Sequence, residues 1–286
     1  MSQLKELRDK MLKDLGGIYT EQECLNMVNW LFLSVAGIEK KEFSLDRGKL
    51  IDEKIKAELL EKLSELMAHK PIQYVTGTAY FHDLELAVNP SVLIPRPETE
   101  ELVKWVADDN KEIAGLKVLD IGTGSGCIIL ALGNLLKNPR LTAVDVSAKA
   151  IETALGNAIK FDIRVDFKIA DILEENEWNK LGTYDLIISN PPYVRESEKC
   201  MMQANVLDYE PSVALFVPDR DPLLYYRAIA RFSKRHLSEN GKLYLEINEN
   251  LGKEVMVLLK DEGFLEIILK KDMQGKDRMV RCISNN

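Results

Sequence analysis

Short apolar segments alternate with helical segments along the second half of the chain, and this alternation restricts the possible folds more than any other feature. Each predicted strand is separated from the next by enough residues for a helix, which is typical of a parallel sheet with helices on both faces. The predicted strands cover residues 117–121, 141–146, 166–170, 184–189 and 242–247. The sequence therefore predicts an α/β fold.

The chain closes with two further predicted strands, 264–270 and 279–284, which are separated only by a turn around Gln274 and Gly275. Two strands joined by so short a turn form a hairpin, so one runs antiparallel to the other. We therefore expect an antiparallel C-terminal hairpin at the edge of the sheet.

The N-terminal region has a different pattern, that of a small helical bundle. Thr20 and Glu23 form a capping box ahead of an apolar segment, 24–35. Farther on, apolar residues recur at steps of three and four, which places them on one face of an amphipathic helix. These residues are Ile51, Ile55, Leu59, Leu63, Leu66 and Met67. We predict a helical domain over residues 1–70.

The two predicted domains are joined by a segment in which Pro71 ends the helical region. Residues 73–88 are rich in Tyr, Val, Thr and Phe, which indicates a short hairpin. Three prolines within 89–100 predict an ordered turn before a helix that begins near Glu98. We therefore expect a hairpin linker over 71–94 and a second domain over 95–286.

Composition excludes several classes of protein. The net charge of -8 argues against binding DNA or RNA by neutralising phosphates, which needs clustered Lys and Arg. The four cysteines are far apart and form no CxxC pair, so neither a zinc site nor a disulfide framework is indicated. The most apolar early segment, 30–38, is much shorter than the ~20 residues of a spanning helix. We expect a cytoplasmic protein without metal, membrane span or signal segment.

A glycine-rich turn between a strand and a helix indicates a ligand site, because glycine lets the backbone approach a ligand closely. The spacing matches neither the dinucleotide fingerprint nor the phosphate-binding loop. The turn follows Asp120 and Ile121 and consists of Gly122, Thr123, Gly124, Ser125 and Gly126. Asp145 ends the next strand, where a carboxylate accepts hydrogen bonds from ribose hydroxyls. Together they predict a nucleoside site.

Asp171 and Ile172 follow the third predicted strand and extend this site. Asp171 would accept a hydrogen bond from an adenine amino group, and Ile172 would form an apolar wall beside the ring. A lone aspartate at such a position is more often a helix cap, and this alternative stays open.

The tetrapeptide Asn190, Pro191, Pro192 and Tyr193 follows the fourth predicted strand and is the most specific motif in the chain. An amide nitrogen is a poor nucleophile, because resonance occupies its lone pair. The Asn190 side-chain oxygen and the Pro191 carbonyl would each accept one hydrogen from an acceptor amino group and orient it. Tyr193 would stack on the acceptor plane. We predict catalytic roles for Asn190 and Pro191, and acceptor binding by all four residues.

These motifs resemble those of the bacterial protein-(glutamine) methyltransferases that modify peptide chain release factors. The resemblance covers nearly the whole chain. The matching segments are 94–100 (Ile-Pro-Arg-Pro-Glu-Thr-Glu), 120–126, Asp145, 190–193, 209–211 (Tyr-Glu-Pro) and 275–278 (Gly-Lys-Asp-Arg).

The resemblance implies a Rossmann-like methyltransferase sheet that binds S-adenosylmethionine and releases S-adenosylhomocysteine. It implies that residues 122–126, Asp145, Ile172 and Asn190 line the cofactor, and that residues 190–193 bind glutamine. The acceptor would be the glutamine of a Gly-Gly-Gln tripeptide in release factors, which places the enzyme in translation termination. The helical domain would dock the substrate protein, and we expect a monomer. Many relatives carry an aromatic residue at position 172, so Ile172 would stack less on adenine.

Three alternatives stay open at this point. A related branch methylates glutamine in a ribosomal protein, but it matches this chain less well at Pro97, Glu98 and Thr99. A DNA or RNA adenine methyltransferase could use the same tetrapeptide, but it would need a basic recognition surface. A non-catalytic protein that binds S-adenosylmethionine would not require the Asn190 motif.

Overall fold

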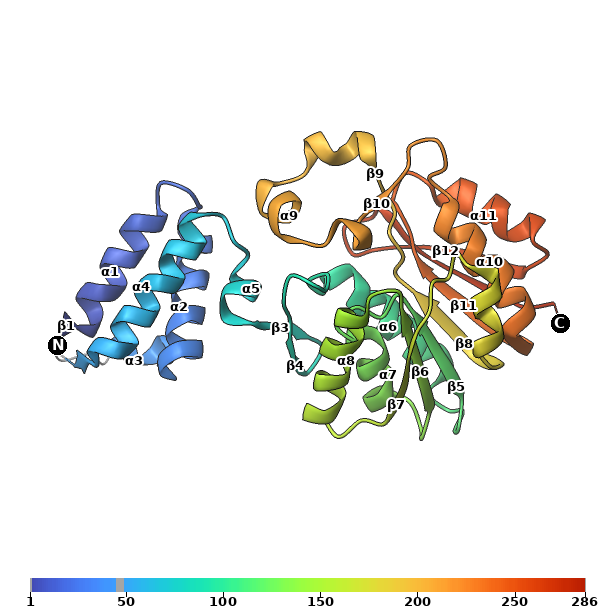
Figure 1. The fold of residues 1–286 in the computed structure, drawn as a ribbon, viewed down its shortest axis with the longest axis horizontal. Coiled ribbons are helices and arrows are strands. Elements are labelled where there is room, and N and C mark those ends of the chain that lie inside the picture. The colour runs from blue at the N-terminus through green and yellow to red at the C-terminus, as the bar shows by residue number, and fades with distance from the viewer. Residues whose placement is uncertain (1, 45–48, 286) are drawn as a thin grey trace. The chain divides into compact units, whose positions relative to one another are not determined.

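The structure is a computed structural model that describes residues 2–44 and 49–285. The chain divides into two compact units (Figure 1). The first comprises Met1–Thr78 together with Gln203–Tyr209, and the second comprises Ala79–Met202 and Glu210–Asn286. The chain therefore leaves the second unit for seven residues, which contain α9 (Ala204–Tyr209), and then returns to it.

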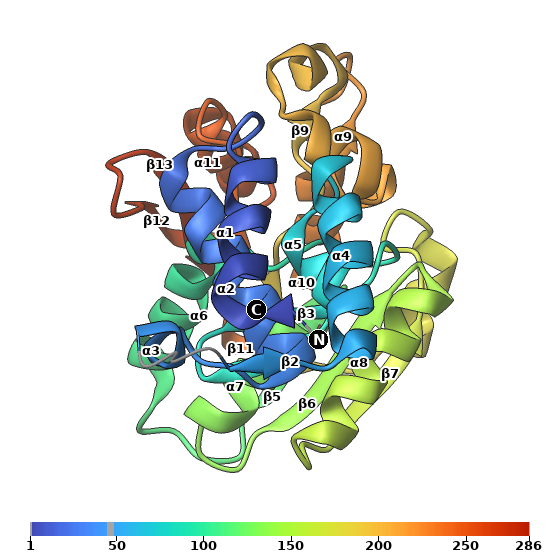
Figure 2. The same ribbon diagram turned by 90° about the vertical axis from the view of Figure 1, so that its left-hand side faces the viewer.

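The first unit is a bundle of helices, as the apolar periodicity predicts. Its longest helices, α1, α2 and α4, lie side by side (Figures 1 and 2). The elements are β1 (Ser2–Gln3), α1 (Leu4–Leu15), α2 (Glu21–Ala36), α3 (Lys40–Ser44), β2 (Leu50–Ile51), α4 (Glu53–Met67) and α5 (Ile72–Thr76). The predicted capping box is confirmed, because the Thr20 side chain accepts from Glu23 N and the Glu23 carboxylate accepts from Thr20 N. Of the predicted apolar face, Leu59, Leu63 and Leu66 are buried, whereas Met67 is exposed.

The helical region extends beyond Pro71, contrary to the sequence prediction. Residues 72–76 form α5, which begins directly after Pro71 and ends at Gly77 in the left-handed conformation. Proline fits the start of a helix, where no backbone N–H donor is needed. The predicted hairpin is therefore present but shorter, with strands β3 (Thr78–Phe81) and β4 (Leu84–Ala87). Helix α6 (Pro97–Asn110) follows, close to its predicted start.

A seven-stranded sheet forms the centre of the second unit, in the order β12-β13-β11-β8-β5-β6-β7 (Figure 1). Every predicted strand is present. Their bounds are β5 (Lys117–Ile121), β6 (Arg140–Asp145), β7 (Val165–Ile169), β8 (Tyr184–Ser189), β11 (Leu237–Glu246), β12 (Leu265–Lys271) and β13 (Asp277–Ile283).

The antiparallel strand is β13, and it lies one position in from the edge, between β11 and β12. The predicted antiparallel hairpin at the edge of the sheet is confirmed. Burial explains why β12, rather than β13, is the outermost strand. Val280 and Cys282 of β13 are fully buried, whereas β12 is largely exposed and therefore suits the edge.

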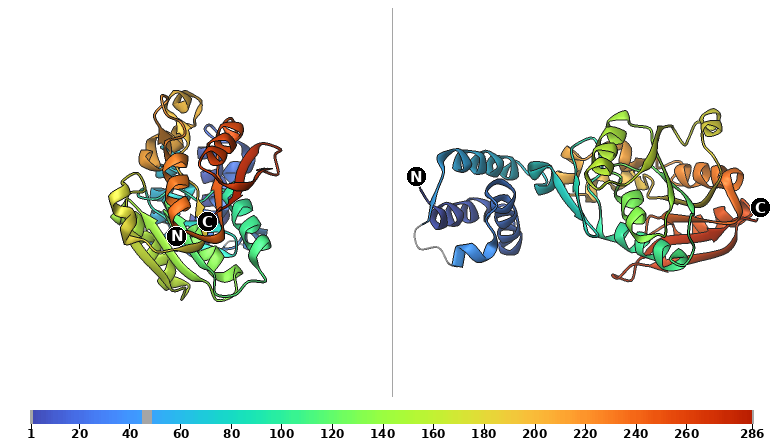
Figure 3. Two further views of the ribbon diagram at one scale, coloured as in Figure 1. Left: turned by 90° about the vertical axis from the view of Figure 1, so that its right-hand side faces the viewer. Right: turned by 90° about the horizontal axis from the view of Figure 1, so that it is seen from below.

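Helices cover both faces of this sheet (Figure 3). One apolar cluster joins the sheet to α6 and α7 (Cys127–Leu135), and the other joins it to α10 (Leu224–His236) and α11 (Gly252–Asp261). Successive residues of β5, Val118 and Leu119, belong to opposite clusters, as the alternation of side chains along a strand requires.

The remaining elements complete the connections of the second unit. They are α8 (Ala148–Lys160), η1 (Glu175–Lys180), β9 (Val194–Arg195), η2 (Glu196–Met201), η3 (Ser212–Ala214) and β10 (Phe216–Val217). Within residues 2–44 and 49–285, no helix combines the length and the apolar character needed to cross a membrane.

Candidate active site

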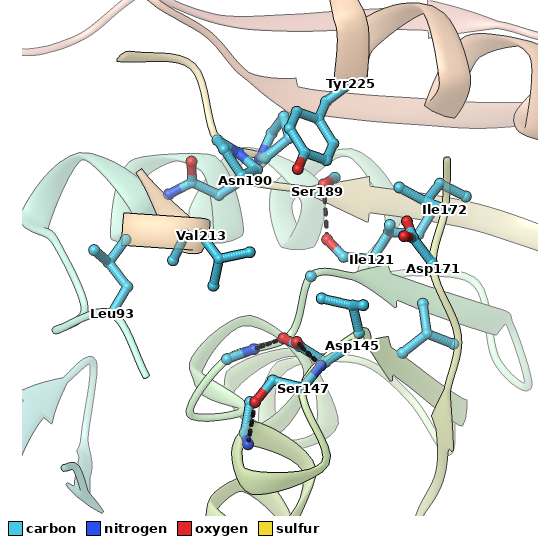
Figure 4. Close-up of a pocket in the computed structure, with 18 of the residues that line it drawn as sticks. Leu93, Ile121, Asp145, Ser147, Asp171, Ile172, Ser189, Asn190, Val213 and Tyr225 are labelled. Carbon is cyan, nitrogen blue, oxygen red and sulfur yellow. Dashed lines mark hydrogen bonds between the residues drawn. The ribbon is translucent and has the colours of Figure 1, made fainter. Parts of the chain in front are cut away.

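A pocket opens at the carboxyl ends of β5, β6, β7 and β8 (Figure 4). Strands β6 and β7 extend the sheet on one side of β5, and the chain then crosses to β8 on the other side. Open α/β sheets bind ligands at such a switch point. Several predicted site residues line the pocket: Gly122, Gly124, Asp145, Asp171, Ile172, Asn190, Pro191 and Pro192. Others are Ser91, Val92, Leu93, Ser147, Val213, Ala214 and Tyr225.

The glycine-rich turn contributes Gly122 and Gly124 to the pocket, both with positive φ. Its other members form the turn itself. The Thr123 hydroxyl donates to the Asp120 carboxylate at 2.7 Å. The backbone carbonyl of the buried Ser125 accepts from the side-chain nitrogen of Asn157.

Gly126 begins α7 with a φ of 83°. A β-carbon there would lie 3.2 Å from Leu130 Cδ1 and 3.3 Å from Ala154 Cβ. Gly126 therefore allows the start of α7 to pass close to Ala154 of α8.

Asp145 presents an oriented carboxylate to the pocket. Its Oδ2 accepts from Gly124 N and its Oδ1 accepts from Ser147 N, both at 2.9 Å. Burial raises the pKa of Asp145, while these backbone donors oppose the rise. Each oxygen keeps a lone pair for a ligand. The carboxylate is thus fixed in place at the end of β6, where a ribose diol would be bound.

Asp120 lies beneath the same turn and is completely buried. Burial raises its pKa to about 7, and the nearby charge of Asp145 adds to the rise. The hydrogen bond from Thr123 acts in the opposite direction. Asp120 therefore stabilises the turn through Thr123.

Asp171 and Ile172 both line the pocket beyond β7 (Figure 4). Asp171 Oδ1 accepts from Leu173 N at 2.9 Å, and Asp171 N donates to Glu177. The carboxylate thus closes a local turn, as aspartate commonly does, and still borders the pocket. The carbonyl of Ile172 accepts from the Trp178 indole, which fixes the backbone of this wall.

Asn190 is connected to two buried side chains that sequence reasoning did not identify. Its Nδ2 donates to Thr99 Oγ1 at 3.0 Å, and the Thr99 hydroxyl donates to Glu246 Oε2 at 2.6 Å. Thr99 lies in the first turn of α6, and Glu246 ends β11. Because Thr99 engages the Asn190 nitrogen, Oδ1 is the atom that can accept from a ligand.

Tyr193 is not among the pocket-lining residues. Its hydroxyl donates to Glu246 Oε1 at 3.0 Å, and burial raises its pKa well above the ordinary value. Glu246 thus accepts from both Thr99 and Tyr193. The aromatic group bordering the pocket beside Ser189 and Asn190 is Tyr225 of α10, which sequence reasoning also missed (Figure 4).

The buried carboxylate of Glu210 anchors the loop that carries Val213 and Ala214 to the pocket. It accepts from Ile94 N at 3.2 Å and from Arg96 Nη2 at 2.6 Å, and its side chain is only 1% exposed. The proline-rich segment before α6 and the Tyr-Glu-Pro segment therefore meet through this ion pair.

The sequence offered a signal for some of these residues. Glu246 is an acid at the end of a predicted strand, the same pattern that identified Asp145. Thr99 and Glu210 stand in motifs whose contacts a sequence alone does not specify. Within the described part of the chain, no three His, Cys, Asp or Glu side chains are grouped to bind a metal ion.

Comparisons with known proteins agree with this geometry. The sequence model of the family described as "Methyltransferase small domain" matches residues 99–208. The "Release factor glutamine methyltransferase" of Flavobacterium psychrophilum is 41% identical to this chain over 97% of it and 98% of the relative. The protein of the same name from Bacteroides thetaiotaomicron is 38% identical over 94% of this chain and 95% of the relative.

Solved structures of methyltransferases share the fold. A methyltransferase from Pyrococcus furiosus is similar with a TM-score of 0.50 and 18% identity, covering 82% of this chain and 100% of that one. The Thermus thermophilus 16S rRNA N2 G1207 methyltransferase, in complex with AdoMet and guanosine, has a TM-score of 0.50 and 16% identity. That comparison covers 73% of this chain and 50% of the other. At these identities the similarity bears on the fold alone.

Proposed function

The chain belongs to the family of release factor glutamine methyltransferases, and on that premise we propose that it methylates a peptide chain release factor. The methyl group of S-adenosylmethionine goes to the side-chain amide nitrogen of a glutamine. One observation carries the proposal. Asp145, at the nucleoside end, and Asn190, at the amide-binding end, line a single pocket. A methyl donor and a planar acceptor nitrogen would therefore meet there.

The chemistry of the pocket fits the cofactor. Asp145 supplies a fixed carboxylate for the ribose hydroxyls, and Gly122 and Gly124 allow close approach of the backbone. Asp171 would accept from the adenine amino group, and Ile172 would cover the ring. Thr123, Ser125 and Gly126 would contribute by shaping the turn. When bound, the cofactor supplies an electrophilic methyl group on sulfur, and its demethylated product is S-adenosylhomocysteine.

The acceptor amide would be bound at Asn190 and Pro191. The Asn190 oxygen and the Pro191 carbonyl each accept one hydrogen of the glutamine amino group, which directs its nitrogen toward the methyl group. Both oxygens would stabilise the positive charge that develops on the nitrogen as it accepts the methyl group. The nitrogen then releases one proton to water. Pro192 would form a wall of this site, and stacking by Tyr193 stays a prediction.

The finer assignments follow the same premise. The substrate glutamine would be that of the Gly-Gly-Gln tripeptide, so methylation would modulate translation termination in the cytoplasm. Residues 1–70 would dock the release factor, 71–94 would form the linker and 95–286 would catalyse the transfer. The enzyme would act as a monomer without metal.

The test uses the purified protein, methyl-labelled S-adenosylmethionine and a release factor from the same organism. The factor is supplied with its tripeptide glutamine intact or replaced by alanine. Label on the intact factor alone is expected. Asn190→Ala should abolish labelling, whereas Asn179→Ala, a change at an exposed asparagine of η1, should not. Label only on ribosomal protein or on nucleic acid would refute the choice of substrate.

A further inference from the structure

We propose that Thr99 and Glu246 are positioning residues, which fix the Asn190 amide so that its oxygen is available to the acceptor. This inference rests on the proposed function of the pocket and deepens it. Neither Thr99 nor Glu246 is among the residues that line the pocket, so both would act through Asn190.

The contacts form a continuous chain from the centre of the protein to the pocket. Glu246 is 1% exposed and Thr99 is 2% exposed, so water does not compete for these bonds. Glu246 Oε2 accepts from the Thr99 hydroxyl at 2.6 Å, and Thr99 Oγ1 accepts from Asn190 Nδ2 at 3.0 Å. The three side chains come from β11, α6 and the turn after β8.

The direction of each bond follows from the inventory of donors. A carboxylate can only accept, and a threonine hydroxyl has one hydrogen to donate. If Thr99 gives that hydrogen to Glu246, its oxygen can only accept from Asn190. The amino group of Asn190 must therefore face Thr99. In the flipped orientation, Asn190 would present hydrogens to the hydrogens of the acceptor amide, and neither group could bond.

Burial raises the pKa of Glu246 above its ordinary value, and the bonds from Thr99 and Tyr193 and the charge of Arg278 limit this rise. Arg278 is held by ion pairs to Asp272 and Glu249, each at 3.1 Å. The length of 2.6 Å between Thr99 and Glu246 is typical of a hydroxyl that donates to an ionised carboxylate.

Tyr193 also takes part in this arrangement. Its hydroxyl occupies Oε1 of Glu246, so the oxygen that remains for Thr99 is Oε2. The tetrapeptide would thus bind the acceptor through Asn190. Through Tyr193, it would also hold in place the Glu246 carboxylate that orients Thr99 and Asn190.

The experiment compares Thr99→Val, which removes the hydroxyl at constant shape, with Thr99→Ser, which keeps it. Thr142→Val, on β6, makes the same chemical change outside this chain of contacts. With release factor and cofactor saturating, we expect Thr99→Val to lower kcat about 10- to 100-fold, as is typical when the partner that orients a functional side chain is removed. Thr99→Ser and Thr142→Val should stay within about threefold of wild type, and no variant should change cofactor affinity appreciably.

A second readout observes the Asn190 amide directly. In protein carrying nitrogen-labelled asparagine, the side-chain resonance of Asn190 is identified by its loss in Asn190→Ala. Its hydrogens should exchange with water slowly in the wild type and in Thr99→Ser, and faster in Thr99→Val. The exposed Asn179 provides the fast reference within the same spectrum.

Three results would overturn the proposal. One is a kcat of Thr99→Val close to wild type while Asn190→Ala is inactive. Another is an equal loss in Thr99→Val and Thr99→Ser with matching losses of thermal stability, which would indicate a role in packing. The third is fast exchange of Asn190 in the wild type, which needs no variant to fold. If the wild type methylates no release factor, the proposed function fails, and the exchange measurement still decides whether Thr99 holds Asn190.

Discussion

Replacing Gly126 by alanine is expected to destabilise the catalytic unit more than the same replacement at Gly124. Both glycines have positive φ, 83° at Gly126 and 55° at Gly124. A β-carbon in this region of conformational space costs about 1 kcal/mol. This penalty is common to the two positions, so any difference between them has another origin.

The two variants should differ in stability because the added β-carbon has different neighbouring atoms at the two positions. At Gly124 no atom lies within 4 Å of it. At Gly126 it would lie 3.2 Å from Leu130 and 3.3 Å from Ala154, where α7 packs on α8. Overpacking of this kind costs about 1–3 kcal/mol. We therefore expect losses of about 2–4 kcal/mol for Gly126→Ala and about 1 kcal/mol for Gly124→Ala.

Thermal unfolding followed by tryptophan fluorescence measures these losses. In a Trp30→Phe background the remaining tryptophans, Trp105 and Trp178, lie in the catalytic unit. For a unit of this size, 1 kcal/mol lowers the melting temperature by about 2–4 °C. Gly126→Ala should therefore melt roughly 4–16 °C below the parent, and Gly124→Ala roughly 2–4 °C below.

Cofactor binding separates the two glycines further. Gly124 lines the pocket, so Gly124→Ala should weaken binding of S-adenosylmethionine. Gly126→Ala, measured well below its melting temperature, should bind it normally. Equal melting temperatures would refute the packing argument. Weakened cofactor binding in a stable Gly126→Ala would instead assign Gly126 to the ligand site.

Three further outcomes are expected. Asp145→Asn replaces an acceptor oxygen by a donor beside a backbone N–H, and calorimetry should record a loss of cofactor affinity of about 10- to 100-fold, the worth of one charge-assisted bond. Arg96→Met leaves Glu210 buried without its cation, and urea unfolding should show a loss of about 3 kcal/mol in the free energy of unfolding. Lys104→Met, which breaks an exposed ion pair, should cost under about 1 kcal/mol. Because the pKa of Asp120 is raised to about 7, the folded state retains a proton that the unfolded chain has released. Stability should then fall as the pH rises from about 4 to 7, by at most about 4 kcal/mol, and Asp120→Asn should flatten this profile.

The central strands β5 and β8 could be predicted because nearly all of their residues are buried, so that they read as short apolar runs. The bounds of β5 and β8 match the predicted ones, 117–121 and 184–189. Strand β11 begins at Leu237 rather than 242, because Leu237 pairs with Tyr184 across a shift of register. The residues between, Ser238 to Gly241, are polar and include glycine, so the sequence alone favours a turn there.

The site was predictable where a residue type and a strand end coincide. Asp145, Asp171 and Asn190 follow successive strands, and the topology brings their ends together. Residue type and position do not show which way a side chain points or which group it contacts. The position of Tyr193 predicts an aromatic ring at the acceptor site but not the partner of its hydroxyl, which is Glu246, because a buried hydroxyl needs a partner.

The side chains of Arg96 in the proline-rich segment and Thr99 in the first turn of α6 do not line the pocket, but they hold residues that do. Arg96 pairs with Glu210 and so secures the loop that carries Val213, while Thr99 supports Asn190. These contacts span more than 90 residues of sequence, so no local pattern reveals them. In the proposed function, both act on groups at the acceptor end rather than on Asp145 or the glycine turn. Substitutions at Arg96 and Thr99 should therefore lower the rate of methyl transfer while leaving cofactor affinity nearly unchanged, and a loss of affinity instead would mean that the segment shapes the nucleoside end.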